Sequence, residues 1–422
     1  MQEVFRKLHS DSLFRNSFYL MLATGVMAGF GFFFWLISAH LVSPEDIGIA
    51  TSLISVLSII SIFSLIGFDS ALVRFLAHST QRNDKLNTGI ILVGGVALVL
   101  GGIFVFFVHE ISPQLSFIRE NIFMSTGFIL FCAMSAINIL TDAVFLAYRQ
   151  TKFSLIINAI FSFIKMLLPL AFVSWGAYGI FAAAAVGQSI GFVLSIAVIM
   201  WKFDYRPAFV INLDIINEVW KYCAGNYVAG ALNLLPVTLL PLIITNHLGL
   251  KEAAYFYIVM MIGNLLYTIP HATTRSLFAE GSYDTQTIGV NMKKSFKIIS
   301  TLLIPATLIL LASGKYVLEF FGKSYSTDGI LFLYIIAISG IAVSGYSLFN
   351  SLFRLRKNLR ALIIINIFYA GSIIFLSYVL LPLGLTGIGV AWLGGNITAC
   401  IAGYALSPKN STINSLPKNR DT

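Results

Sequence analysis

The sequence has little charge and few cysteines. Only 11% of its 422 residues are charged, whereas 58% are hydrophobic, so the chain lacks the polar surface that a soluble domain of this length needs. Its three cysteines, Cys132, Cys223 and Cys400, stand alone in apolar runs, with no CxxC or Cys/His spacing. This pattern gives no indication of a disulfide framework or a metal site. The composition therefore predicts a helical membrane protein that crosses the bilayer many times.

The sequence also lacks a dense basic segment of the kind that binds nucleic acid. The formal net charge is +9, but the basic residues are spread over short loops between apolar runs, which membrane orientation explains better. With a cytoplasmic amino terminus, 22 of the 27 Lys and Arg residues fall on the inner side, four fall in outer loops, and Lys165 lies within a span. We therefore predict a multi-pass protein of the inner (plasma) membrane with both termini in the cytoplasm.

Apolar windows of roughly 20 residues mark the predicted transmembrane helices. The first long apolar run, residues 13–41, is too long for the apolar region of a cleavable signal, so we interpret it as a retained span. The predicted spans number twelve, six in each half: 16–39, 47–68, 88–109, 122–146, 153–173, 179–201, 222–245, 253–271, 296–314, 329–351, 360–381 and 385–405.

Two stretches, residues 149–188 and 357–396, have the pattern of one transmembrane hairpin written twice. At a constant offset of 208 residues the aligned pairs are Asn158 with Asn366, Gly176 with Gly384, Gly179 with Gly387, and Gly187 with Gly395. Repeats of equal topology, related by an axis along the membrane normal, place a central cavity between two halves, and this is an architecture of transporters.

These observations predict an all-α polytopic membrane protein with twelve transmembrane helices in two six-helix halves related by a pseudo-two-fold axis along the membrane normal. The predicted parts are an N-terminal bundle at 1–201, a cytoplasmic linker at 202–221, a C-terminal bundle at 222–406 and a disordered cytoplasmic tail at 407–422. The alternating polar and apolar residues of the linker fit either a helix on the inner membrane surface or an ordinary connection.

Lys165 is the strongest single candidate for binding a ligand. It lies twelve residues beyond the predicted inner start of its span, or about 18 Å, which is past the midplane of the bilayer. An ammonium at this depth is expected to face a wet cavity or a partner, or to extend its stem toward the outer headgroups. Asp142 on the neighbouring span is too shallow to pair with it, whereas Asn138, one turn deeper, lies nearer its level.

Four further residues are candidates for function. Arg74 and Arg275 occupy comparable inner ends of the second and eighth spans, where a planar guanidinium suits a pyrophosphate headgroup, although positive-inside anchoring also accounts for them. Pro236 and Pro241 interrupt the seventh span. Because each proline removes a backbone hydrogen bond, we predict either a bend that gates the cavity or a packing kink.

Several short motifs appear in a fixed order along the chain: HLVSPEDIGIA at 40–50, ALVR at 71–74, the basic AYRQTKFS turn, the G-x-x-G pair at Gly176 and Gly179, and NHLGLKEAAYF at 246–256. Together they resemble the polysaccharide biosynthesis flippases, the Wzx-type group of the multidrug, oligosaccharidyl-lipid and polysaccharide exporter superfamily. The first motif departs from the R-L-L-G-P-E-D-[YF]-G stretch of that family, because His40 and Ser43 replace its arginine and glycine. His40 recurs as His247, which fits a structural role at a helix end or a proton sensor.

The resemblance implies a flippase that moves a polyprenyl-pyrophosphate-linked oligosaccharide to the outer leaflet for surface polysaccharide synthesis, with membrane lipid around it and glycosyltransferases and a polysaccharide polymerase as partners. Alternating access requires no covalent step, so we predict no enzyme activity and no cofactor beyond a coupling proton or sodium ion. One alternative is a multidrug cation antiporter, which needs a buried carboxylate such as Asp142 or Asp69. A second is a membrane glycosyltransferase or polysaccharide ligase, although the outer connections are short and their acids scattered.

Overall fold

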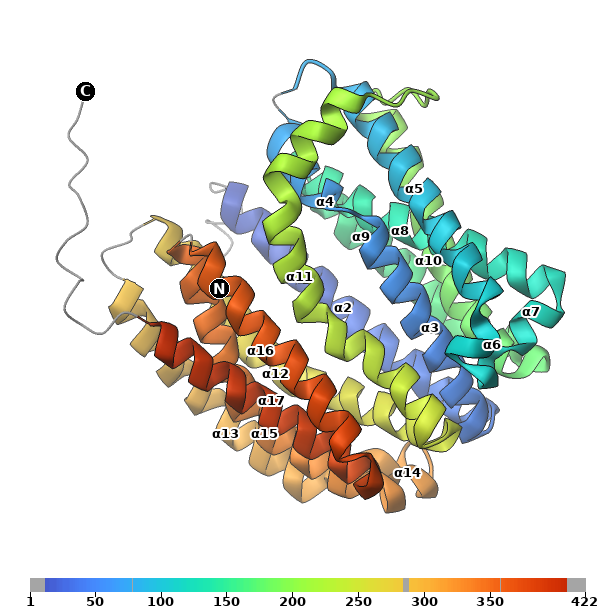
Figure 1. Ribbon diagram of the computed structural model, residues 1–422, viewed down its shortest axis with the longest axis vertical. Coiled ribbons are helices and arrows are strands. Elements are labelled where there is room, and N and C mark those ends of the chain that lie inside the picture. The colour runs from blue at the N-terminus through green and yellow to red at the C-terminus, as the bar shows by residue number, and fades with distance from the viewer. Residues whose placement is uncertain (1–11, 78, 284–287, 357, 408–422) are drawn as a thin grey trace. The chain divides into compact units, whose positions relative to one another are not determined.

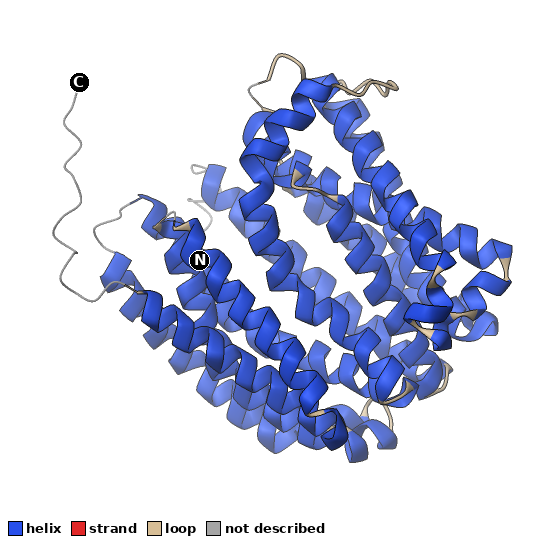
Figure 2. Ribbon diagram, viewed as in Figure 1, coloured by secondary structure: helices blue, strands red, loops and turns tan. Residues whose placement is uncertain are grey.

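The computed structural model describes residues 12–77, 79–283, 288–356 and 358–407, and the predicted tail after Ser407 lies outside this range. Within these residues the regular structure is entirely helical, as Figure 2 shows. Eleven apolar stretches are long enough to span a membrane, and one of them, Lys152–Lys202, contains two helices. The twelve predicted spans therefore each correspond to a helix in the described part of the chain.

The long helices of the first half are α2 (Ser12–Leu41), α3 (Pro44–Ser64), α5 (Arg82–Phe106), α8 (Ile122–Ala147), α9 (Lys152–Phe172) and α10 (Gly176–Lys202). Those of the second half are α11 (Leu213–His247), α12 (Leu250–Tyr283), α13 (Ile288–Glu319), α15 (Ile330–Leu355), α16 (Leu359–Val379) and α17 (Gly384–Leu406). Short helices join them: α4 (Phe68–Phe75), α6 (Val108–Ile111), η1 (Pro113–Leu115), α7 (Phe117–Glu120), η2 (Val173–Trp175), α14 (Lys323–Asp328) and η3 (Leu381–Leu383) (Figure 1).

The packing divides the chain into two compact units. One comprises Met1–Leu265 with Ser313–Leu333, and the other comprises Leu266–Ala312 with Tyr334–Thr422. In the first unit, α2 meets later helices through aromatic contacts, Phe32 with Phe321 at 5.3 Å and Trp35 with Tyr257 at 4.6 Å between ring centroids. These units are defined by contacts within the fold and do not test the predicted boundaries at 201, 221 and 406. The division of the sequence into two bundles, a linker and a tail therefore stays a prediction.

The second unit is held by a buried polar network that joins α15 to α16. The Asn366 side-chain oxygen accepts hydrogen bonds from the Tyr346 hydroxyl at 2.6 Å and from the Asn350 amide at 3.4 Å. The Asn366 amide donates to the Leu362 carbonyl at 2.7 Å. The Tyr346 ring stacks on Tyr369 at 4.4 Å. Polar groups buried in a membrane helix need such partners, so Asn366, a residue of the repeat, has a structural role.

The two hairpins of the repeat have the same local geometry, each within its own unit. Gly176 and Gly384 have positive φ angles of 55° and 62°, and each follows a short 3-10 helix. This left-handed region favours glycine, which explains the predicted break between the fifth and sixth spans. A side chain at Gly179 would collide with the Phe172 carbonyl, and one at Gly387 would collide with the Leu380 carbonyl. The structure thus confirms the repeat that the sequence indicates.

The connection between the halves is only partly as predicted. Residues 204–212 have no helical structure, and the helix begins at Leu213, where Asn212 caps it by accepting hydrogen bonds from the Asp214 and Ile215 amides. The predicted surface helix is therefore wrong for 204–212, and an ordinary connection is correct there. Pro207 has no backbone N–H to donate, and the backbone groups of Arg206 and the amide of Ala208 bond to asparagine side chains of α5.

Candidate functional site

Lys165 lies in α9, the first helix of the hairpin, and α9 packs closely against α10 and α2. Its stem contacts Gly187 of α10, where an added Cβ would lie 2.7 Å from the Lys165 Cβ. Its Nζ lies 5.3 Å from the ring centroid of Phe34 in α2, which is buried. The equivalent position of the second hairpin, at the 208-residue offset, is Ile373, which contacts Gly395 in the same way. The duplicated scaffold is therefore retained in both hairpins, whereas the charge occurs in only one.

The ammonium of Lys165 has an aromatic partner but no acidic one. Within the described ranges no carboxylate forms an ion pair with it. A cation over an aromatic ring gains about 0.5 to 2 kcal/mol. Placing a charge at the centre of a membrane helix costs about 2.5 to 3.5 kcal/mol on insertion scales. The contact with Phe34 thus offsets only part of the cost, and an anionic ligand would be stabilised here.

Polar residues recur along one face of α9 between its start and Lys165. Ser154, Asn158 and Ser162 follow one another at spacings of four residues, with Lys165 three residues further, so they share a helix face. All three are buried. The Ser162 hydroxyl and the side-chain carbonyl of Gln188 on α10 are buried and make no hydrogen bond in the part of the chain that the structure describes. Buried polar groups are normally paired, so these two unpaired atoms are exceptions on the buried polar face beside Lys165.

Two polar residues of α8 lie on the neighbouring helix. Asp142 is half-buried and lies near Ser154, whose buried hydroxyl makes no hydrogen bond in the described structure. Asn138 is half-buried, and its backbone carbonyl accepts a hydrogen bond from Thr141 at 2.7 Å. No hydrogen bond joins Asn138 to Lys165 in the described structure. The predicted association of these two side chains is therefore not seen as a direct contact, and a role of Asn138 in binding stays a prediction.

The two candidate arginines lie in different compact units. Arg74 is exposed in the last turn of α4, with its guanidinium carbon 5.4 Å from the Phe75 ring centroid, and Lys85 approaches the same ring at 5.2 Å. Arg275 is exposed on α12, in the second unit. Both residues are exposed, and their predicted role in binding a phosphate stays a prediction.

Both candidate gating prolines lie inside α11, which remains helical through them. Between them, the Thr238 hydroxyl donates to the Leu234 carbonyl at 3.0 Å and the Leu235 carbonyl at 3.1 Å. Side-chain hydroxyls commonly satisfy backbone groups near prolines in membrane helices. The helix therefore does not end at either proline, and the bend or packing kink and its role in gating stay predictions.

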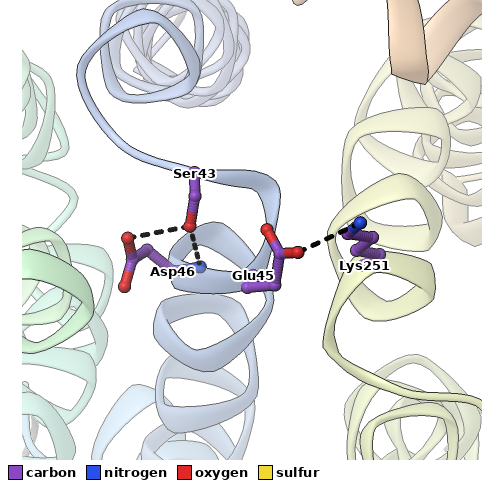
Figure 3. A network of polar contacts seen from close by, with 4 residues as sticks. All are labelled: Ser43, Glu45, Asp46 and Lys251. Carbon is purple, nitrogen blue, oxygen red and sulfur yellow. Dashed lines mark hydrogen bonds and ion pairs between the residues drawn. The ribbon is translucent and has the colours of Figure 1, made fainter.

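A polar junction between the two sequence halves was not predicted (Figure 3). It lies where α3 begins and α12 begins. Ser43 caps α3, since its hydroxyl accepts from the Asp46 amide at 3.2 Å and donates to the Asp46 carboxylate at 2.9 Å. Glu45, in the first turn of α3, forms an ion pair with Lys251 of α12, with 3.2 Å between the carboxylate oxygen and the ammonium nitrogen. Ser43, which departs from the family motif, therefore has a clear structural role.

Close backbone contacts continue this junction, which we call the outer junction because Lys251 falls in a predicted outer loop. Gly48 of α3 packs directly against the Leu250 carbonyl, and the Ser52 hydroxyl contacts the Thr245 hydroxyl of α11. The adjacent Asn246 accepts a hydrogen bond from Ser112 at 2.6 Å and donates to the Ile111 carbonyl at 2.7 Å. Polar and small residues are the usual means of close helix association in membranes.

We expect Gly48→Ala to weaken the outer junction. The new Cβ would collide with the Leu250 carbonyl, which is backbone and cannot rotate away, and overpacking of this kind typically costs about 1 to 3 kcal/mol. The measurement is the thermal unfolding temperature of the purified protein. Gly95→Ala on α5 is the matched control, because nothing lies within 4 Å of a Cβ there. Equal stability of the two variants would contradict the assigned contact.

Comparison with known proteins agrees with this architecture. A family model described as polysaccharide biosynthesis protein matches residues 37–327, more than half of the chain. No curated protein sequence matches this chain. Among solved structures, the lipid II flippase MurJ in an inward closed conformation has a TM-score of 0.75 and 14% identity, over 91% of this chain and 86% of that one.

Two other solved structures have the same fold. A multidrug resistance MATE family transporter of the MOP superfamily, in its inward-facing conformation, has a TM-score of 0.68 and 15% identity, over 90% of this chain and 92% of that one. A MOP superfamily transporter from Pyrococcus furiosus, described by the reverse polarity of its binding pocket, has a TM-score of 0.64 and 13% identity, over 93% and 94%. These similarities confirm the predicted all-α fold of twelve transmembrane helices in two halves.

Proposed function

Because the chain belongs to the polysaccharide biosynthesis protein family, we propose that it is a flippase that moves a polyprenyl-pyrophosphate-linked oligosaccharide from the cytoplasmic to the outer leaflet. The observation that carries this proposal is the ammonium of Lys165, held inside a membrane-spanning hairpin with no carboxylate partner in the described structure. Alternating access between two states is sufficient for such movement, so no catalytic residue is assigned.

The chemistry of the proposed substrate matches the chemistry of the α9 face. A pyrophosphate is a dense anion that a lysine binds through charge-assisted hydrogen bonds. The unpaired Ser162 hydroxyl can donate to a phosphate oxygen, and the unpaired side-chain carbonyl of Gln188 can accept from a sugar hydroxyl. The polyprenyl chain can stay in hydrocarbon while the polar headgroup moves. Arg74 and Arg275, both exposed, are proposed to receive the headgroup from the cytoplasmic side.

We propose that a proton or a sodium ion drives the cycle, with Asp142 as the carboxylate that responds to it. Asp142 is half-buried within α8 and lies near Ser154, at the start of the polar face that leads to Lys165. An ionisable residue inside a membrane span commonly marks an ion pathway. In cells, selective loss of export with a proton ionophore, or on sodium removal, distinguishes the two ions. Export that is insensitive to both treatments would rule out this coupling.

A multidrug cation antiporter is the second candidate function. The MATE fold similarity and the half-buried Asp142 favour it, because an antiporter of cations needs a carboxylate that exchanges a cation or proton for the drug. Lys165 on the next helix, α9, opposes it, since a fixed positive charge repels a cationic drug.

Glycosyltransferases and a polymerase are proposed as partners of the flippase, and the inner membrane as its location.

A deletion strain distinguishes the two functions. We expect loss of the gene to cause intracellular accumulation of lipid-linked glycan and loss of surface polysaccharide, because the substrate is made but not moved. The measurement is extraction of the lipid-linked fraction followed by mass spectrometry, with a complemented strain as control. Hypersensitivity to cationic drugs without glycan accumulation would contradict the flippase and support the antiporter.

A further inference from the structure

The segment that joins the two sequence halves is fixed to α5. It leaves α10 through Asp204, whose φ of 52° lies in the left-handed region, and continues without regular structure to residue 212. We call residues 204–212 the connecting strap; it lies beside the start of α5 in Figure 1. All of α5, α10, α11 and the strap belong to the first compact unit, so their contacts are internal to one body.

One buried asparagine of α5 makes most of these contacts. The Asn87 side-chain oxygen accepts hydrogen bonds from the Tyr205 hydroxyl at 2.7 Å and from the Ala208 amide at 3.0 Å. Its amide donates to the Arg206 carbonyl at 3.3 Å. Burial raises the pKa of the Tyr205 phenol, so this hydroxyl remains a donor at physiological pH. The strap is therefore held by specific bonds and is not a free linker.

A second α5 residue fixes the depth of the strap relative to the bilayer. Thr88 accepts a hydrogen bond from the Asn212 amide at 3.1 Å and contacts the Val210 carbonyl at 3.5 Å. Thr88 is also the first residue of the predicted third span. From Thr88 to the end of α5 at Phe106 the helix rises about 27 Å, close to the thickness of the hydrocarbon core. The predicted third span, 88–109, thus places residues 210–212 at the boundary between headgroups and hydrocarbon.

The strap directs apolar side chains outward at this depth. Phe209 is 87% exposed, Ile211 48% and Leu213, the first residue of α11, 70%. Trp201, in the last turn of α10 just before the strap, is also 77% exposed. Exposed apolar groups gathered in this way mark an interaction site. Because the predicted third span places them at the bilayer boundary, the partner that fits is phospholipid.

The charges beside these residues do not select an anionic surface. Lys202 and Arg206 are exposed, but so are Asp204 and Asp214, and the two signs balance. The interaction is therefore expected to depend on apolar insertion and to occur in neutral as well as anionic bilayers. Aromatic residues at the level of the headgroups are typical of such anchors.

We propose that the connecting strap is a membrane-interface anchor in which Phe209, Ile211 and Leu213 insert among phospholipids at the predicted cytoplasmic face. Since Asn87 and Thr88 hold the strap to α5, the anchor ties the junction of the two sequence halves to the first unit and to the bilayer surface. This inference does not depend on the identity of the transported substrate.

Site-specific photocrosslinking tests the proposal in the full-length protein. Phe209 is replaced by the photoreactive p-benzoylphenylalanine, which is similar in shape and at an exposed position should not disturb folding. The purified protein is reconstituted into vesicles of phosphatidylethanolamine alone or with phosphatidylglycerol, illuminated, and analysed by peptide mass spectrometry. The same replacement at Phe163, an exposed residue in the middle of α9, is the positive control, and at Asp204 the negative control.

We expect phospholipid adducts at residue 209 at a level comparable to residue 163 and several-fold above residue 204, in both lipid compositions. Absence of lipid adducts at 209, with adducts present at 163, would overturn the proposal. Crosslinks from 209 to a second copy of the chain would equally overturn it and would assign the surface to self-association. If the variant at 209 does not accumulate, the same measurement at Ile211 decides the question, with the same expected results.

Discussion

Lys165→Ala is expected to abolish polysaccharide export while leaving the amount of protein in the membrane unchanged. The substitution removes the ammonium that we propose binds the pyrophosphate. A hydrogen bond to a charged group contributes about 1.5 to 3 kcal/mol, which corresponds to a loss of roughly 10- to 150-fold in apparent affinity. The measurement is surface polysaccharide in a deletion strain complemented with each variant, normalised to membrane abundance.

Two further variants separate charge from packing. Lys165→Met keeps an unbranched stem against Gly187 but carries no charge, and we expect it to be as defective as alanine. Lys165→Arg keeps a positive charge in a different shape and should retain part of the activity. Full export by the methionine variant would exclude the ammonium as a ligand for the substrate. Similar loss in all three variants, with normal abundance, would indicate that the exact stem geometry is what matters.

The helices were predictable because their signals are local. Each span is an apolar run of sufficient length, and the break between α9 and α10 was marked by Gly176, whose positive φ the structure confirms. The turn between α3 and α4 was not predicted. There the chain passes through Ile66 at φ 47° and Gly67 at φ 82°, and a lone glycine after a long apolar run gives only a weak signal. Hydropathy alone therefore extended the second span too far.

The candidate site was predictable only in part. The depth of Lys165 follows from its position in the apolar run, but its aromatic partner Phe34 does not, because tertiary packing decides which helix faces it. The ion pair of Glu45 with Lys251 joins residues distant in the sequence and has no local signal. The internal repeat does offer a long-range signal for this ion pair. At an offset of 207 residues Lys251 is equivalent to Pro44, the neighbour of Glu45, and equivalent positions of two repeats meet near the axis that relates them.

The outer junction should have to open during transport, and a covalent link across it should therefore arrest the cycle. The proposed alternating access requires helices of the two sequence halves to separate on the outer side when the substrate is released. Glu45 and Lys251 are the residues to link, since their side chains meet at 3.2 Å and both are partly exposed. We expect the double variant Glu45→Cys/Lys251→Cys, treated with a short, reducible bifunctional maleimide, to lose nearly all export.

The native ion pair itself should not limit the rate. Exposed ion pairs are weak and are screened by salt, so each single variant, Glu45→Cys or Lys251→Cys, should export at close to the normal rate with or without the reagent. These single variants also control for reaction at the native cysteines. Cleavage of the linker by a reductant should restore export in the double variant, which separates reversible arrest from damage. Normal export by a protein shown by mass spectrometry to be crosslinked would mean that this junction stays closed throughout the cycle. The proposed movement of the two halves would then have to be replaced by one in which the start of α3 and the start of α12 move together.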